Sequence, residues 1–136
     1  MRIVSKGEKI MENFLQLLAH YLIGFYFIFF GFWNIYHWTP ITEVMIKRNL
    51  PSPFFLLSIA IGIQIIAGFM IMSNTWIMLA SIVLIFFTFF IVFLLHPFWH
   101  FTGELRKQHM ALFVTNLTVT LGALLLLTTA SKPLIS

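Results

Sequence analysis

Long apolar stretches alternate along the chain with short polar segments, and every Asp, Glu, Lys and Arg lies outside the apolar stretches. Each stretch holds about 20 residues, enough for a helix to cross the roughly 30 Å hydrocarbon core of a bilayer. Backbone polar groups in lipid must pair within their own helix, and barrel strands would alternate apolar and polar residues, which 82–87 does not. The pattern predicts transmembrane helices over residues 14–36, 54–72, 76–95 and 110–129.

The connections between these helices differ in length. Residues 73–75 alone join the second and third helices, which predicts a tight antiparallel hairpin. Residues 37–53 form a longer loop, in which Pro51 and Pro53 stop any helix and restart the next one. We therefore expect an all-α, integral membrane, four-helix antiparallel bundle, with residues 1–136 forming a single transmembrane domain.

The third connection, residues 96–109, is the most polar segment of the chain. Pro97 biases His96 away from helical geometry, so the third helix is predicted to end there. Thr102 is placed to cap the following helix, and Glu104 adds a negative charge to its first turn, where the helix dipole favours one.

An even number of spans places both termini on one side of the membrane. Each side then carries four of the eight basic residues, so the positive-inside rule is tied. The first helix usually dominates orientation, and three basic residues precede it, which favours cytoplasmic termini. The four Trp residues fall at span ends, where interfacial Trp is expected; they are Trp33, Trp38, Trp76 and Trp99.

Composition supports a membrane protein and excludes several functions. The chain is 60% hydrophobic and 9% charged, whereas a soluble domain has about 25% charged residues. It has no Cys, which excludes disulfides, thiol redox chemistry and Cys-ligated metal clusters. The net charge of +4 suits a membrane surface, and no basic stripe indicates nucleic acid. The expected partners are the lipid bilayer and either other membrane subunits or a second copy of the chain.

Four of the five His residues, His37, His96, His100 and His109, lie at the end of the bundle opposite the termini, with Tyr36 and Glu104. His96 and His100 have the i, i+4 spacing of a metal or haem site, but Pro97 interrupts that spacing. Three interpretations stay open: headgroup contacts of interfacial residues, a quinone or lipid headgroup site, and a metal or haem site. Aromatic residues and His suit a quinone ring, so quinone is favoured over haem or metal.

Polar residues inside the predicted spans need partners. Gln64 and Asn116 lie within helices two and four, and Asn34 faces inward from helix one. Their side chains are predicted either to hydrogen-bond across helices or to line a small cavity for a ligand headgroup. His20 is interpreted as a residue that extends to the membrane interface. Gly residues that allow helices to approach closely are Gly24, Gly31, Gly62, Gly68 and Gly122.

No catalytic motif and no metal-ligand motif is recognised. The candidate cofactor-binding residues are His96, Trp99, His100, His109, Gln64 and Asn116.

The order of short motifs along the chain resembles the DoxX family of small four-helix membrane proteins. The motifs are Leu22-Ile23-Gly24 with Gly31, Leu50-Pro51, Gln64 with Gly68, His96-Pro97-Phe98-Trp99, and Asn116-Leu117 with Gly122. The resemblance implies a role as an oxidoreductase or quinol-oxidase-associated subunit, without a demonstrated active site. Where relatives often carry Arg, Lys and Glu, this chain has His20, Asn34 and Gln64, so an intramembrane ion pair or proton relay is not expected here.

Two functions follow as hypotheses, both in the bacterial inner membrane. The first is a non-catalytic accessory subunit of a membrane oxidoreductase or quinol-linked system, which binds quinone near the His cluster. The second is a membrane scaffold, chaperone or lipid-binding protein without a redox role, in which the residues around Gln64 and Asn116 hold a lipid or a partner helix.

Overall fold

The computed structural model describes residues 5–130, and all regular secondary structure in that range is helical. The elements are α1 (Lys6–Tyr36), α2 (Trp38–Lys47), α3 (Pro53–Met72), α4 (Ile77–Leu95), the 3₁₀ helix η1 (Phe98–His100), α5 (Gly103–Thr115), the π-helix η2 (Asn116–Thr120) and α6 (Leu121–Ala130). Within residues 5–130, four helical spans are long and apolar enough to cross a membrane: α1, α3, α4 with η1, and the continuous α5–η2–α6 helix. The prediction of an all-α membrane bundle is confirmed.

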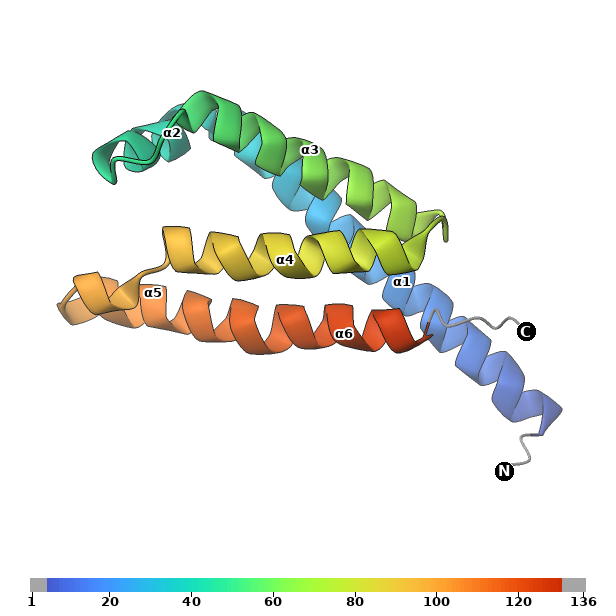
Figure 1. The fold of residues 1–136 in the computed structure, drawn as a ribbon. Helices are drawn as coiled ribbons and strands as arrows, with labels where there is room; N and C mark the ends of the chain where they lie inside the picture. The colour runs from blue at the N-terminus through green and yellow to red at the C-terminus, as the bar shows by residue number, and fades with distance from the viewer. Residues whose placement is uncertain (1–4, 131–136) are drawn as a thin grey trace.

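The helices are arranged as two antiparallel pairs (Figure 1). α1 packs along α3, and α4 packs along α6, while the short turn between α3 and α4 joins the pairs. From that turn α3 and α4 diverge toward the end of the bundle that holds α2 and α5 (Figure 1). The beginning of α1 and the end of α6 lie at the opposite end. Arg2 and Lys132, which enter the charge count for orientation, lie outside the described residues.

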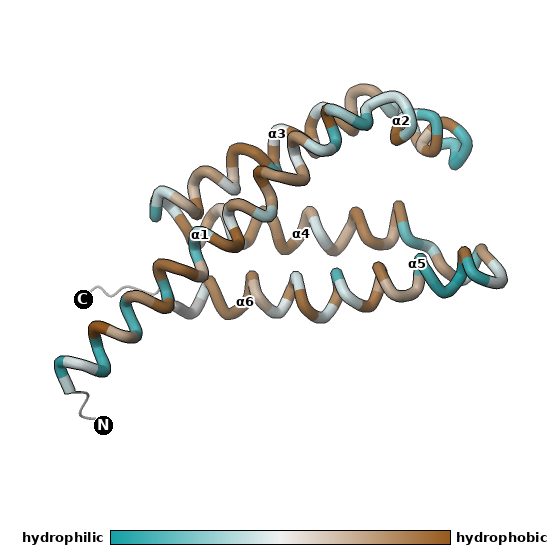
Figure 2. Tube along the Cα trace, turned by 180° about the vertical axis from the view of Figure 1, so that it is seen from behind, coloured by the Kyte–Doolittle hydropathy of each residue, from teal (hydrophilic) through white to brown (hydrophobic). Residues whose placement is uncertain are grey.

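Hydropathy along the chain follows the bundle axis (Figure 2). The middle of each span is hydrophobic, and hydrophilic residues gather in α2, in α5 and at the beginning of α1 (Figure 2). Many large apolar side chains on the outside are exposed, among them Phe25 and Phe69, as expected of a surface that faces lipid. The main core cluster joins α1, α3, α4 and α6 and contains Phe27, Ala67, Ile71, Ile77, Ala80, Leu84, Leu124 and Leu127.

Glycines set the close approach of α1 and α3. A Cβ atom added to Gly68 would lie 2.8 Å from the carbonyl oxygen of Gly24, and one added to Gly24 would lie 2.7 Å from that of Gly68. Gly31 is also too close to α3 for a side chain. The predicted role in helix approach is therefore confirmed for these three residues, and it is wrong for Gly62 and Gly122, which face open space.

The first connection differs from the prediction, because it contains the ten-residue helix α2 instead of only a loop. Pro40 lies in the first turn of α2, where a proline does not interrupt the helix. The buried Met45 packs on Leu57 and Ile61 of α3, so tertiary contacts stabilise this short helix. As predicted, the helix ends before the two prolines, and α3 begins at Pro53.

The ends of α4 and α5 follow the sequence more closely. α4 ends at Leu95 with His96 as its C-cap, as Pro97 predicts. Thr102 occupies the N-cap position of α5 and Glu104 lies in its first turn, although the Thr102 side chain makes no capping hydrogen bond. The last span thus begins at Gly103, before the apolar stretch, because its polar first two turns continue the helix beyond the hydrocarbon region.

Candidate functional site

Several polar side chains within the membrane spans line one cavity, which we call the polar cavity. It has a volume of about 410 Å³ and lies between α1, α3, α4 and the α5–η2 segment. Its polar lining consists of Asn34, Gln64, Thr88, His96, Asn116 and Thr120. Its aromatic lining consists of Tyr26, Phe27, Phe30, Trp33 and Phe87. Neutral hydrogen-bonding groups therefore face a space with aromatic walls.

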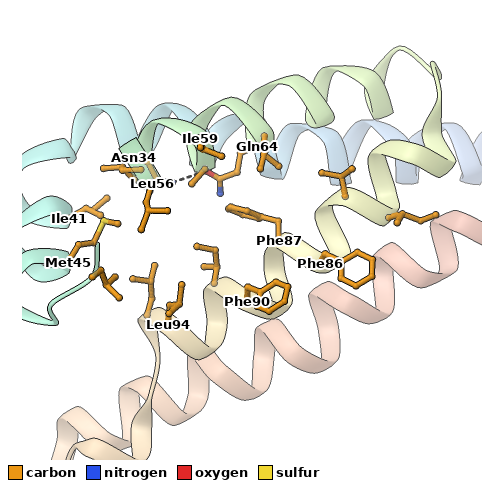
Figure 3. Close-up of a pocket in the computed structure, with 18 residues that line it drawn as sticks. Asn34, Ile41, Met45, Leu56, Ile59, Gln64, Phe86, Phe87, Phe90 and Leu94 are labelled. Carbon is orange, nitrogen blue, oxygen red and sulfur yellow. Dashed lines mark hydrogen bonds between the residues drawn. The ribbon is translucent and has the colours of Figure 1, made fainter. Parts of the chain in front are cut away.

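A second cavity of about 480 Å³, the apolar cavity, lies in the wedge between α2, α3 and α4 (Figure 3). Aliphatic and aromatic side chains form nearly all of its wall, and Phe86, Phe87 and Phe90 of α4 belong to that wall (Figure 3). Both cavities are lined by Asn34, Gln64, Phe87, Ile91 and Leu95. The two spaces are therefore neighbours on either side of one polar pair.

That polar pair links α1 to α3. The Asn34 side-chain Nδ2 donates to Gln64 Oε1 at 2.8 Å, and Gln64 is buried. The predicted interhelical hydrogen bond is thus present at Gln64. Figure 3 shows the Gln64 amide directed into the space between α3 and α4. Because this bond uses only the oxygen of Gln64, its Nε2 group keeps two N–H donors for a guest molecule.

The π-helix η2 shapes the opposite wall. π-helices are rare, and short ones within α-helices often occur at functional sites. Here η2 begins at Asn116 and ends at Thr120, and both residues line the polar cavity. The prediction that Asn116 hydrogen-bonds across helices is wrong, because its Nδ2 donates to the Leu112 carbonyl of its own helix at 2.8 Å.

The side chains of His96 and His109 contact each other. Their Nδ1 atoms lie 3.1 Å apart, which is hydrogen-bonding distance. A bond between two ring nitrogens needs one donor and one lone pair, so at least one ring is neutral. Phe101 stacks on His109, with ring centroids 4.5 Å apart and planes at 14°. His109 thus holds the ring of His96, which alone of the two lines the polar cavity.

Arg48, the residue after α2, links α2 to the end of α4. Its Nη1 donates to the carbonyl oxygens of Leu94 at 3.0 Å and of Leu95 at 2.7 Å, and its guanidinium lies 5.6 Å from the Phe101 ring centroid. Burial lowers the pKa of Arg48, but an arginine starts so far above neutrality that it stays charged. Sequence reasoning missed this contact. One signal was available: α4 has no basic residue in its last turn, so its final carbonyls need donors from elsewhere in the chain.

The other candidate residues lie elsewhere. Trp99 and His100 belong to η1 and line a separate hollow. As the position of Pro97 predicted, His96 and His100 do not share a face of one helix, because α4 ends before Pro97, and His96 pairs with His109. His37 stacks on Trp33 with ring centroids 4.1 Å apart and contacts the Trp33 carbonyl. In residues 5–130, no group of three or more His, Asp or Glu side chains is arranged to hold a metal ion.

His20 also departs from the prediction. It was expected to extend to the membrane interface, but it is only 7% exposed, and its Nε2 has no hydrogen-bond partner in the described part of the chain. His20 is one of the buried residues of α1 and faces the interior of the bundle.

The fold and its cavities define an integral membrane four-helix bundle with a polar cavity inside the membrane region. A family model described as DoxX matches residues 15–97, and the chain belongs to the DoxX family. The match covers most of α1 and all of α2, α3 and α4, whereas His109 and Asn116 lie beyond it. No curated protein and no solved structure matches the chain.

Proposed function

We propose that this DoxX-family protein is a non-catalytic accessory subunit of a membrane oxidoreductase or quinol-linked system, and that it binds quinone in the polar cavity. One observation carries the proposal: the Asn34–Gln64 pair and His96 face a single aromatic-walled cavity that adjoins an apolar one. Ligand sites are commonly pockets of about 300–1,000 Å³ with mostly apolar walls and a few convergent polar groups.

The chemistry of the two cavities suits the two parts of a quinone. The ring carbonyls accept hydrogen bonds, which Gln64 Nε2 and a ring N–H of His96 are placed to donate. The flat ring suits the aromatic walls around Phe30 and Phe87. An isoprenoid tail is apolar and matches the neighbouring cavity of α2, α3 and α4. In this proposal the protein binds and orients the quinone, and a partner subunit exchanges electrons with it.

The apolar cavity supports a second candidate, a lipid-binding protein without a redox role. Its wall is almost entirely hydrocarbon, and Ile59, Phe86 and Phe90 belong both to this wall and to the exposed surface that faces lipid. An acyl chain is therefore able to enter sideways from the bilayer. The two candidates differ in the group that meets the amides of Asn34 and Gln64. A quinone offers ring carbonyls as hydrogen-bond acceptors there, whereas a phospholipid has no such ring.

We also propose the cellular setting. The protein is placed in the bacterial inner membrane with both termini in the cytoplasm, because the basic residues before the first span favour that orientation. The exposed apolar faces are available to membrane subunits of a complex or to a second copy of the chain.

A titration of the purified protein with a short-chain ubiquinone tests the proposal. Binding is followed by quenching of Trp fluorescence, since Trp33 lines the polar cavity. We expect His96→Phe to weaken binding about tenfold, the value of one good hydrogen bond. His100→Phe is the matched control and keeps wild-type affinity, because His100 lines a different hollow.

Equal quinone affinity of the wild type and His96→Phe would contradict the proposal that quinone binds in this cavity. Organic extraction of the purified protein separates the candidates further. Stoichiometric quinone supports the first candidate, whereas stoichiometric phospholipid without quinone supports the second.

A further inference from the structure

A third hollow lies at the α2 end of the bundle, and we call it the basic hollow. It measures about 600 Å³ and shares no residue with the polar cavity. Its lining comes from α2, from Arg48 and Leu50 in the connection to α3, from the end of α4, and from η1 with its neighbours Pro97 and Phe101.

The charge in this hollow has one sign. Lys47 and Arg48 contribute two cations, and no Asp or Glu belongs to the lining. Arg48 is fixed in place by its bonds to the Leu94 and Leu95 carbonyls, so its positive charge has a defined position. A preorganised cation such as Arg48 favours a bound anion because little of its side-chain entropy is lost on binding.

The hollow also runs onto the lipid-facing surface. Phe93 is 40% exposed and Leu94 is 43% exposed, and both belong to the apolar span of α4. Trp99, which is 48% exposed, stands beside them just beyond the helix end, the position that interfacial Trp occupies in membranes. The occupant that matches both ends of this hollow has an anionic head and apolar chains.

We infer that the basic hollow binds the headgroup of an anionic phospholipid. The phosphodiester lies between Lys47 and Arg48, and the acyl chains lie along Phe93 and Leu94. Basic pockets between transmembrane helices are a known way to recognise anionic headgroups. A zwitterionic lipid is disfavoured, because its ammonium group would lie among cations. Inorganic phosphate has no acyl chains to contact the apolar part of the hollow, formed by Phe93 and Leu94. This inference does not depend on quinone binding.

The test is native mass spectrometry of the full-length protein in a mild detergent, with equal concentrations of phosphatidylglycerol and phosphatidylcholine of the same chain length. We expect phosphatidylglycerol to be retained preferentially. Lys47→Ala is expected to weaken its binding about fivefold, the effect of one basic residue near an anionic headgroup. Lys47 is exposed, so the substitution leaves folding intact.

Lys107→Ala is the matched control. Lys107 lies at the same end of the bundle, is highly exposed and lies 3.6 Å from Glu104, outside the basic hollow. We expect this variant to bind phosphatidylglycerol like the wild type. Three results would overturn the inference: equal retention of both lipids, equal weakening by the two substitutions, or competition by millimolar inorganic phosphate that abolishes lipid binding.

Discussion

Replacing Gly68 with alanine is expected to force α1 away from α3 and to lower the free energy of unfolding by about 2 kcal/mol. The new Cβ would lie 2.8 Å from the carbonyl oxygen of Gly24 and 2.7 Å from Cγ1 of Ile28. The Ile28 side chain is able to rotate away, but the Gly24 oxygen belongs to the backbone of α1. The helices must therefore separate, which weakens the van der Waals contacts that hold helices together in lipid.

Gly62→Ala provides the control, because Gly62 lies on the same helix and a Cβ there meets nothing within 4 Å. We expect this variant to unfold like the wild type when detergent-solubilised protein is titrated with sodium dodecyl sulfate. If Gly68→Ala and Gly62→Ala were equally stable, the close packing of α1 on α3 would be contradicted.

Replacing Arg48 with leucine is expected to lower the free energy of unfolding by about 2 kcal/mol. The substitution removes both side-chain hydrogen bonds to the last carbonyls of α4 and the contact with Phe101. Leu94 and Leu95 then have to find other donors at the edge of the membrane, where an unpaired carbonyl is costly. Because these bonds tie α2 to the end of α4, we also expect faster amide hydrogen exchange around His96.

Arg106→Leu is the matched control for this second prediction. Arg106 also lies near an aromatic ring, with its guanidinium 6.0 Å from the Phe98 centroid, but its α5 position is exposed. A loss below about 0.5 kcal/mol is expected for this surface residue. Comparable losses for the two variants would show that Arg48 acts only as a surface charge.

Local sequence predicted the features that lipid imposes on each helix separately. Unbroken apolar stretches predicted the spans, because a backbone in lipid has to be helical. Pro97 predicted the end of α4, and the depth of Gln64 predicted that its side chain hydrogen-bonds across helices. These features depend on the residue and its immediate neighbours, so a single sequence was enough to find them.

Features that depend on tertiary contact were missed. The helix α2 forms because Met45 packs on α3, and its own sequence of ten residues is too short to indicate a helix clearly. Arg48 reaches carbonyls 46 and 47 residues further along the chain. The pairing of His96 with His109 joins two elements across the connection that contains η1. The His96–His100 spacing, which Pro97 interrupts, gave no indication of this partner.

The lining of the candidate site was therefore predictable in its residue types and only partly in its membership. Gln64, Asn116 and His96 line one cavity, and His109 supports His96 from behind. The π-helix that turns Asn116 and Thr120 toward this cavity has no recognised sequence pattern. The adjoining apolar cavity arises from the divergence of α3 and α4, which follows from how helices pack and not from any one segment.

Photoaffinity labelling with an azido-quinone tests the central claim, quinone binding in the polar cavity, most directly. After illumination and mass-spectrometric peptide mapping, we predict label on the α1 residues around Phe30 and on the segment from Leu112 to Thr120, which face each other across the cavity. Excess unlabelled quinone should abolish this labelling. Label confined to lipid-facing residues such as Phe25 and Phe69, or unaffected by excess quinone, would contradict the account.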